Sequence, residues 1–329
     1  MFLRSLYLAW RRRRIYGPCL SAPVPLVILR YHSVGEPADV DAYLDPRLSM
    51  PPRRFREQMK LLAARFTPVT LAQVPAILAG EKRGGPFVAV TFDDGYRDNH
   101  DVALPILREE GVPATFYVTT APLLGRSPFW ISELWRLARI LPPGQVELPA
   151  NVPAEIPADP AEREQWRRRV TRRLSEIPDE VRQRVLDRLA ERAAVPRGDG
   201  LGDTFLAPDH LRAMRAAGMA IGAHSRTHPH LDRLPVEHHD DEVGGSRQDL
   251  EQVLGEPVPH FAWPNPSGGG TVNETARAAA GRAGFLTAVT SIPGPMTPGV
   301  DRLKLPRLGV YAGEQERLLF RLLERRGGR

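Results

Sequence analysis

Two adjacent carboxylates, Asp93 and Asp94, stand in the stretch VAVTFDDGYRDN. They follow the apolar run 87–90, which is typical of a buried strand, and Gly95 after them allows a tight turn. Side by side in a buried place the two carboxylates repel one another, and burial disfavours the charged form of each. A bound cation would offset both effects. We therefore expect one aspartate to bind a metal ion and its neighbour to accept a proton from a water beside that ion.

Two histidines, His224 and His228, lie in the stretch GAHSRTHPHL directly after the apolar run 219–221. Two neutral imidazoles and one carboxylate make a good site for a divalent cation, with positions left open for water and substrate. An H-x-x-x-H pair alone is more often structural or exposed, and a D-D-G triplet alone is more often a turn. Both together, each at the end of a different expected strand, indicate a metal site much more specifically.

Short strand-like runs alternate with helix-like stretches along most of the chain. Strands are expected within 25–34, 87–95, 114–120, 219–225, 260–264, 285–290 and 303–310, and helices at 52–64, 99–110, 208–217, 237–254 and 273–284. Such alternation predicts an α/β fold with a parallel sheet or barrel. In a βα-barrel the chemistry lies at the C-terminal ends of the strands. The polar residues at these ends are His32, Asp93, Asp94 and His224.

The alternation is interrupted at about 127–205, where the chain is first rich in proline and then rich in arginine and helix-like. We expect a helical insertion there, which could shape a substrate entrance or a partner surface, or be a solvated hairpin without a chemical role. Trp130 and Trp166 lie in it and are expected mainly to pack between helices. The predicted domain is then 25–329 with this insertion, preceded by a basic tail at 1–24.

The composition is that of a soluble globular protein. The chain has 329 residues, enough for one large α/β domain, and carries a net charge of +6 that is mostly arginine. No basic stripe is interleaved with aromatic residues, so a nucleic-acid partner is not expected. Cys19 is the only cysteine, which excludes an internal disulfide.

At the N-terminus, Arg11 to Arg14 follow a short apolar piece, whereas a secretory signal places its charge first. That piece is too short to span a bilayer. We expect a cytoplasmic protein whose basic tip could contact a membrane surface, with a frayed tail as the alternative.

Three stretches, TFDDGY (91–96), HSRTHPHL (224–231) and FAWPNP (261–266), resemble the signature motifs of the polysaccharide deacetylases, the NodB-homology group also called carbohydrate esterase family 4. The resemblance covers about 25–310, interrupted by the insertion. The first two motifs are highly specific in combination, and the third is degenerate. The resemblance implies a distorted (β/α)7-type barrel that removes N-acetyl groups from amino sugars.

The resemblance also implies roles for particular residues. Asp93 matches the general base, and Asp94, His224 and His228 match the metal ligands. Ser225 and Thr227 would brace the histidine loop. The backbone N–H of Asn265 would hold the oxyanion, and Trp263 could line the sugar cleft.

Two departures from the family pattern stand out. The arginine that usually braces the catalytic aspartate is replaced by Ala262, as in an arginine-free branch of the family, and Arg307 could supply the missing brace. The usual late general-acid histidine is absent, since no histidine follows His260. His32, in LRYHSVG, resembles the acid of the circularly permuted poly-N-acetylglucosamine deacetylases; a strand-end histidine without a chemical role is the alternative.

The leading interpretation is a metal-dependent hydrolase, with zinc as the default ion and cobalt, nickel or manganese also suited to the ligands. The expected partner is an N-acetylated amino-sugar glycan or a lipid-linked saccharide. Three alternatives stay open: a hydrolase of another non-peptide C–N bond, a glycan-binding protein without turnover, and an Fe(II) oxygenase. The last would normally bring a β-rich double sheet, which the βα alternation disfavours.

Overall fold

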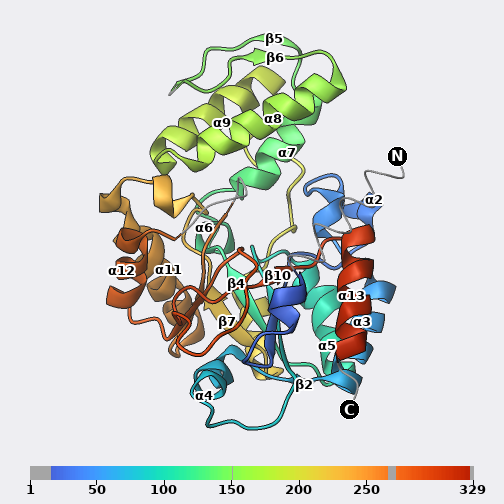
Figure 1. The fold of residues 1–329 in the computed structure, drawn as a ribbon. Helices are drawn as coiled ribbons and strands as arrows, with labels where there is room; N and C mark the ends of the chain where they lie inside the picture. The colour runs from blue at the N-terminus through green and yellow to red at the C-terminus, as the bar shows by residue number, and fades with distance from the viewer. Residues whose placement is uncertain (1–15, 150, 266–271, 327–329) are drawn as a thin grey trace.

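The apolar runs of the sequence form one parallel sheet in the computed structural model, which describes residues 16–149, 151–265 and 272–326 (Figure 1). The strands are β1 (Leu26–Tyr31), β2 (Thr67–Pro68), β3 (Phe87–Phe92), β4 (Ala114–Val118), β7 (Ala220–Ala223), β8 (His260–Ala262), β9 (Thr287–Val289) and β10 (Leu308–Gly309). Their order is β10-β1-β3-β4-β7-β8-β9, with β2 beside β3. All pairs are parallel, as expected for strands that are buried on both faces.

The sheet curls into the distorted barrel that the sequence predicts. Alternate residues of each strand face opposite sides, so that Ile28 and Ala89 lie in an inner core while Leu29 and Val90 lie in an outer one. The chain just before β10 also reaches the far edge, where Leu305 bridges to β9. Residues 305–309 therefore pair with β9 at one edge of the sheet and with β1 at the other. This closes the barrel, so the carboxyl ends of all strands surround one opening.

Helices cover the outside of this sheet (Figure 1). They are α3 (Pro52–Arg65), α5 (Leu104–Glu109), α10 (Pro208–Ala216), α11 (His239–Leu254), α12 (Glu274–Arg282) and α13 (Glu314–Arg326). Shorter helical pieces are α2 (Pro37–Val40), α4 (Val74–Leu78) and α6 (Thr120–Leu123). Each of the five predicted helical ranges contains helix, although 99–110 begins as a π-helical turn, Asn99–Ala103, before α5.

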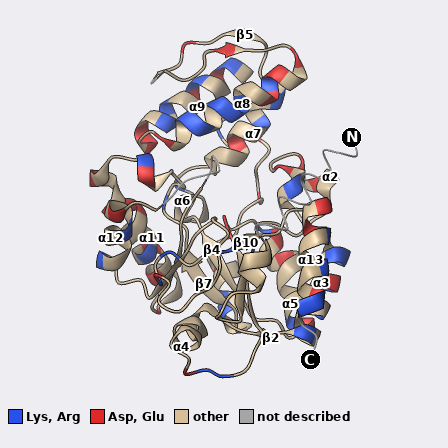
Figure 2. Cartoon of the chain, viewed as in Figure 1, with Lys and Arg blue, Asp and Glu red and all other residues tan. Residues whose placement is uncertain are grey.

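The expected insertion forms a separate lobe at one end of the barrel (Figure 1). It contains α7 (Trp130–Ile140), α8 (Pro160–Ser175), α9 (Asp179–Ala193) and the hairpin β5 (Gly144–Gln145) with β6 (Glu155–Ile156). Trp130 and Trp166 belong to its own apolar core. Arginines line the outer faces of α8 and α9 (Figure 2), because the inner faces are taken up by that core.

The structured body starts earlier than the expected boundary at residue 25. Residues 16–20 are helical, and Tyr16, Cys19 and Leu20 are buried in the outer core. The arginine run at 11–14 lies outside the described residues. Within the described ranges no helix is both long enough and apolar enough to span a membrane.

A buried histidine allows a test of this core by pH. His260 opens β8, is 3% exposed, and its Nδ1 lies 2.8 Å from the hydroxyl of Thr287. Burial, with a smaller contribution from Arg215, lowers the pKa of His260 from 6.5 to about 4. The unfolded chain takes up this proton near the ordinary pKa, and the folded chain does so only near the lowered one. The free energy of unfolding should therefore decrease as the pH is lowered from about 7 to 4.5, by roughly 2 kcal/mol.

Denaturant unfolding at these two pH values measures the effect. His260→Asn should lose less stability on acidification than the natural chain, by about that amount. His238→Gln, on the half-exposed residue before α11, is the control and should match the natural chain. Equal losses in the natural chain and His260→Asn would contradict the assignment.

Candidate active site

The carboxyl ends of the strands open into a cleft of about 420 Å³. His32 follows β1, Asp93 and Asp94 follow β3, and His224 follows β7. All four line this cleft, together with His228, Asn265, Arg30, Tyr96, Ser291 and Tyr311. The polar residues that the sequence places at strand ends are therefore brought together in space.

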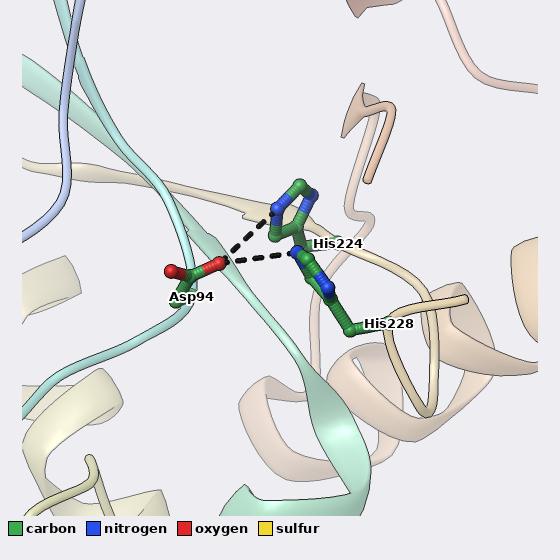
Figure 3. Close-up of side chains that lie close together, drawn as sticks. All are labelled: Asp94, His224 and His228. Atoms are coloured by element: carbon green, nitrogen blue, oxygen red, sulfur yellow. Dashed lines mark ion pairs between the residues drawn. The ribbon is translucent and has the colours of Figure 1, made fainter. Parts of the chain in front are cut away.

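Asp94, His224 and His228 converge on one point from two strand ends and the following loop (Figure 3). One carboxylate oxygen of Asp94 lies 3.4 Å from Nε2 of His224 and 3.3 Å from Nε2 of His228. All three side chains are buried.

The tautomer of His224 shows that this cluster fits a cation. Its Nδ1 lies 2.8 Å from the carbonyl oxygen of Ala262, which can only accept, so Nδ1 must carry the proton. In the neutral ring Nε2 then presents a lone pair to the carboxylate of Asp94. Two lone pairs facing one another in a buried place repel unless a positive charge lies between them. The donor set of two imidazoles and one carboxylate suits zinc and related divalent ions.

The backbone of the site adopts conformations that side chains rarely take. Asp94, Ser225 and His228 have φ values of 76°, 61° and 59°, and such strain clusters at functional sites. Gly95 has a φ of 89°, and a Cβ there would approach the side chain of Val118 to 2.9 Å. The Ser225 hydroxyl accepts the backbone N–H of His228 at 2.9 Å. This hydrogen bond joins the two ends of the histidine loop, the place in which the family resemblance puts Ser225 as a brace.

Thr227 is held from both sides by residues that were not expected to contribute to the site. The buried carboxylate of Glu242 accepts the backbone N–H of Thr227 at 2.9 Å and its hydroxyl. From the insertion, Arg182 donates to the Thr227 hydroxyl at 2.6 Å, and Nε1 of Trp130 donates to the Thr227 carbonyl at 3.0 Å. Arg182 is fully buried and lies over the Trp130 ring, 5.2 Å from its centre. The insertion therefore packs directly against the loop that carries His228.

Arg307 grips Asp93 through both carboxylate oxygens, at 2.6 and 2.7 Å. It also donates to the Thr290 carbonyl and the Thr91 hydroxyl, and it is 1% exposed. Burial alone would raise the pKa of Asp93, but the guanidinium of Arg307 lowers it to about 2. Arg307, directly before β10, therefore holds Asp93 in the way expected of the family arginine that Ala262 replaces.

His32 lies in the cleft, and the chain around it is fixed by the residues after the first motif. The amide of Asn99 donates to the His32 carbonyl at 2.8 Å, and Asp98 accepts the Ser33 hydroxyl and the Val34 backbone N–H. Burial lowers the pKa of His32 to about 4, so the free imidazole is neutral near neutral pH. Neither Asp98 nor Asn99 was expected to support this residue.

Asn265 and Trp263, the two residues of the third motif that were expected to contact substrate, lie in different surroundings. Asn265 lines the cleft, and its backbone N–H has no acceptor among the residues that the structure describes. Trp263 is only 4% exposed, packs against Phe261, and donates Nε1 to the carbonyl of Leu303. Trp263 is not among the residues that line the cleft, because most of its ring is packed in the outer core, and its expected contact with a sugar stays a prediction.

Comparisons with known proteins agree with this geometry. The family model described as Polysaccharide deacetylase matches residues 80–147 and 173–288, which leaves out part of the insertion. A 98-residue stretch is 32% identical to YxkH of Bacillus subtilis, a protein that carries the name of a polysaccharide deacetylase; the match spans 29% of this chain and 32% of that protein.

Solved structures share the fold at low identity. The deacetylase PplD of Streptococcus pyogenes, solved with acetate, has a TM-score of 0.58 and 17% identity, over 91% of this chain and 97% of that one. IcaB of Ammonifex degensii has a TM-score of 0.56 and 18% identity, over the same shares of the two chains.

Proposed function

This chain belongs to the polysaccharide deacetylase family, and from that premise we propose that it is a metal-dependent hydrolase that removes N-acetyl groups from the amino sugars of a glycan. The observation that carries the proposal is the buried cluster of Asp94, His224 and His228 beside the Arg307-bound carboxylate of Asp93. A metal site next to an ionised, oriented carboxylate suits amide hydrolysis by water, because the metal can activate the water and the carboxylate can accept its proton.

Asp94, His224 and His228 would hold the ion, and zinc is the ion we propose first, with cobalt, nickel or manganese as substitutes. When bound, the ion would supply a positive charge that polarises the acetyl carbonyl and makes water more acidic. Asp93 would accept the proton of the attacking water, because its two oxygens are aimed and kept ionised by Arg307. The Asn265 backbone N–H would donate to the acetyl oxygen as negative charge develops there.

The amine cannot leave as an anion, so a proton must reach the sugar nitrogen before the C–N bond breaks. His32 is the group we propose for this step. Its imidazole is neutral in the free protein because burial lowers its pKa. Negative charge on the acetyl oxygen would raise that pKa during the reaction, so His32 would then take up a proton from solvent and pass it to the nitrogen, while Asp93 would return to solvent the proton that it took from the attacking water. The products are acetate and a free amino sugar.

Acetate release tests the proposal. The purified protein, loaded with Zn²⁺, should release acetate from N-acetylchitooligosaccharides or an N-acetylglucosaminyl lipid, lose this activity with a chelator, and regain it when the metal is restored. Bound metal without acetate release from any amide would favour the glycan-binding alternative. Release from cyclic amides but not from sugars would favour the other C–N hydrolase. We also propose a cytoplasmic or membrane-associated location, which cell fractionation would test.

The insertion should control metal affinity through the loop that it braces. Trp130→Phe removes the indole N–H that is donated to the Thr227 carbonyl, together with part of the buried ring, and we expect it to raise the metal Kd about tenfold. Arg182→Lys should have a larger effect, up to about 100-fold, because the amine cannot reproduce the fork held by Thr227, Asp179 and Leu174. Competition with a chromophoric chelator measures both Kd values.

Arg188→Lys is the matched control, since Arg188 lies on the exposed face of the same helix and, among the residues that the structure describes, forms an ion pair with Glu191 alone. Its Kd should equal that of the natural chain. Thermal unfolding of the metal-free proteins separates loss of the site from loss of the fold. An unchanged metal Kd in both Trp130→Phe and Arg182→Lys would show that the insertion does not tune the site.

A further inference from the structure

One charge in the cleft is not used by the mechanism above. Arg30 interrupts the apolar strand β1, is 7% exposed, and lines the same cleft as Asp93 and His32. Taking a guanidinium out of water is costly unless it is paired. A nearly buried arginine without a use in the reaction therefore calls for an explanation.

Arg30 has no carboxylate partner. No Asp or Glu of the described ranges forms an ion pair with it, and the sequence outside those ranges contains neither residue type. The two carboxylates of the cleft are already matched, since Asp93 is held by Arg307 and Asp94 belongs to the proposed cation site. Arg30 contributes less than Arg307 to the lowered pKa of Asp93, and because it forms no ion pair with either aspartate, its charge is not matched by a carboxylate of the cleft.

The contacts of Arg30 are two hydroxyl groups. Its Nη1 donates to the Ser291 hydroxyl and its Nη2 donates to the Tyr311 hydroxyl, while its buried Nε has no acceptor among the described residues. Each hydroxyl accepts from the guanidinium, so its own hydrogen remains available for another acceptor. Both Ser291 and Tyr311 line the cleft, so that acceptor can come from a ligand.

The arrangement is also fitted sterically. The guanidinium carbon lies 5.7 Å from the centre of the Tyr311 ring. A Cβ at Gly309 would come within 2.6 Å of that ring and 3.1 Å of Nη2 of Arg30. The glycine therefore leaves the room in which Arg30 and Tyr311 pack, and any other residue there would displace one of them.

We propose that Ser291 and Tyr311, backed by the charge of Arg30, bind an anionic group of the saccharide, a carboxylate or a phosphate, beside the N-acetyl group that is removed. The preferred substrate is then an anionic amino-sugar glycan rather than a neutral one. This inference rests on the proposed deacetylase function. A hydrogen bond to an ionised group is about twice as strong as a neutral one, so the preference should be measurable in binding.

Binding is measured by calorimetry on the metal-loaded Asp93→Asn protein, so that the saccharides stay intact. A hyaluronan tetrasaccharide supplies a carboxylate, N-acetylglucosamine 1-phosphate supplies a phosphate, and N-acetylchitotetraose and methyl N-acetylglucosaminide are the neutral partners of matched size. At least one anionic probe should bind about tenfold or more tightly than its neutral partner. A preference within the hyaluronan pair would identify the anion as a carboxylate, and a preference within the sugar-phosphate pair would identify it as a phosphate.

In the same background, Arg30→Gln should reduce the anionic preference to within about twofold, and Tyr311→Phe should reduce it in part. Arg282→Gln, which removes an exposed charge paired with Asp240 on α12, controls for net charge and should keep the preference. Equal affinity for anionic and neutral probes, or a preference that survives Arg30→Gln, would overturn the inference. An Arg30-dependent preference in a natural chain that releases no acetate would refute the proposed function and leave the anion site standing.

Discussion

Asp93→Asn is expected to lower kcat for acetate release by about 10³-fold while the protein still binds one metal ion per chain. Asparagine has the shape of aspartate but cannot accept the proton of the attacking water. The ligand cluster of Asp94, His224 and His228 does not include Asp93, so metal binding should persist. Kinetics on a substrate that releases acetate, with metal content measured on the same sample, gives both quantities.

The matched control for this prediction is Glu316→Gln. Glu316 is also buried and also paired with an arginine, Arg54, but it lies on α13 and outside the cleft. This variant tests whether removing the charge of any buried carboxylate beside an arginine lowers activity simply by destabilising the fold. Its kcat should stay within about twofold of the natural value. If Asp93→Asn kept a tenth or more of the natural kcat, Asp93 would not be the base.

The sequence predicts the parts of the site that come from short, contiguous stretches. The buried runs before Asp93 and His224 have a clear apolar pattern, and the carboxyl ends of parallel strands must meet, so convergence of these residues follows from the fold class. The match of the family model to residues 80–147 and 173–288 agrees with that interpretation. The same logic placed Arg307 on a terminal strand, although only the structure shows both of its hydrogen bonds to Asp93.

Contacts between distant parts of the chain could not be predicted in the same way. Arg182 and Trp130 meet Thr227 across 45 and 97 residues of sequence, and neither lies in a pattern that differs from ordinary helix packing. The side-chain direction of Trp263 was hard to predict for a different reason. Trp263 adjoins a motif of the cleft, but its ring points into the outer core because side chains alternate along β8. That strand has only three residues, which is too short for its alternation to be recognised in the sequence.

His32→Ala is expected to lower kcat for N-acetylated sugars by about 10²-fold to 10³-fold and to leave hydrolysis of 4-nitrophenyl acetate nearly unchanged. The two substrates share the acetyl group and the attack by water, but they differ in the group that leaves. An amine must be protonated before it departs, whereas a nitrophenolate is stable as an anion. A residue that only donates this proton should matter for the first substrate alone.

This comparison separates a proton donor from a residue that merely shapes the cleft. The ring of His32 lies 6.5 Å from that of Tyr311, and its side chain fills part of the cleft wall, so its removal could also disturb substrate or metal binding. Such a disturbance would slow both substrates together, and loss of the ion would appear in the metal content. His238→Gln, outside the cleft, is the control and should match the natural chain on both. In the proposed mechanism the ester would need Asp93 and the metal but no acid. A rate ratio of amide to ester that is unchanged in His32→Ala would therefore exclude His32 as the acid and require another donor.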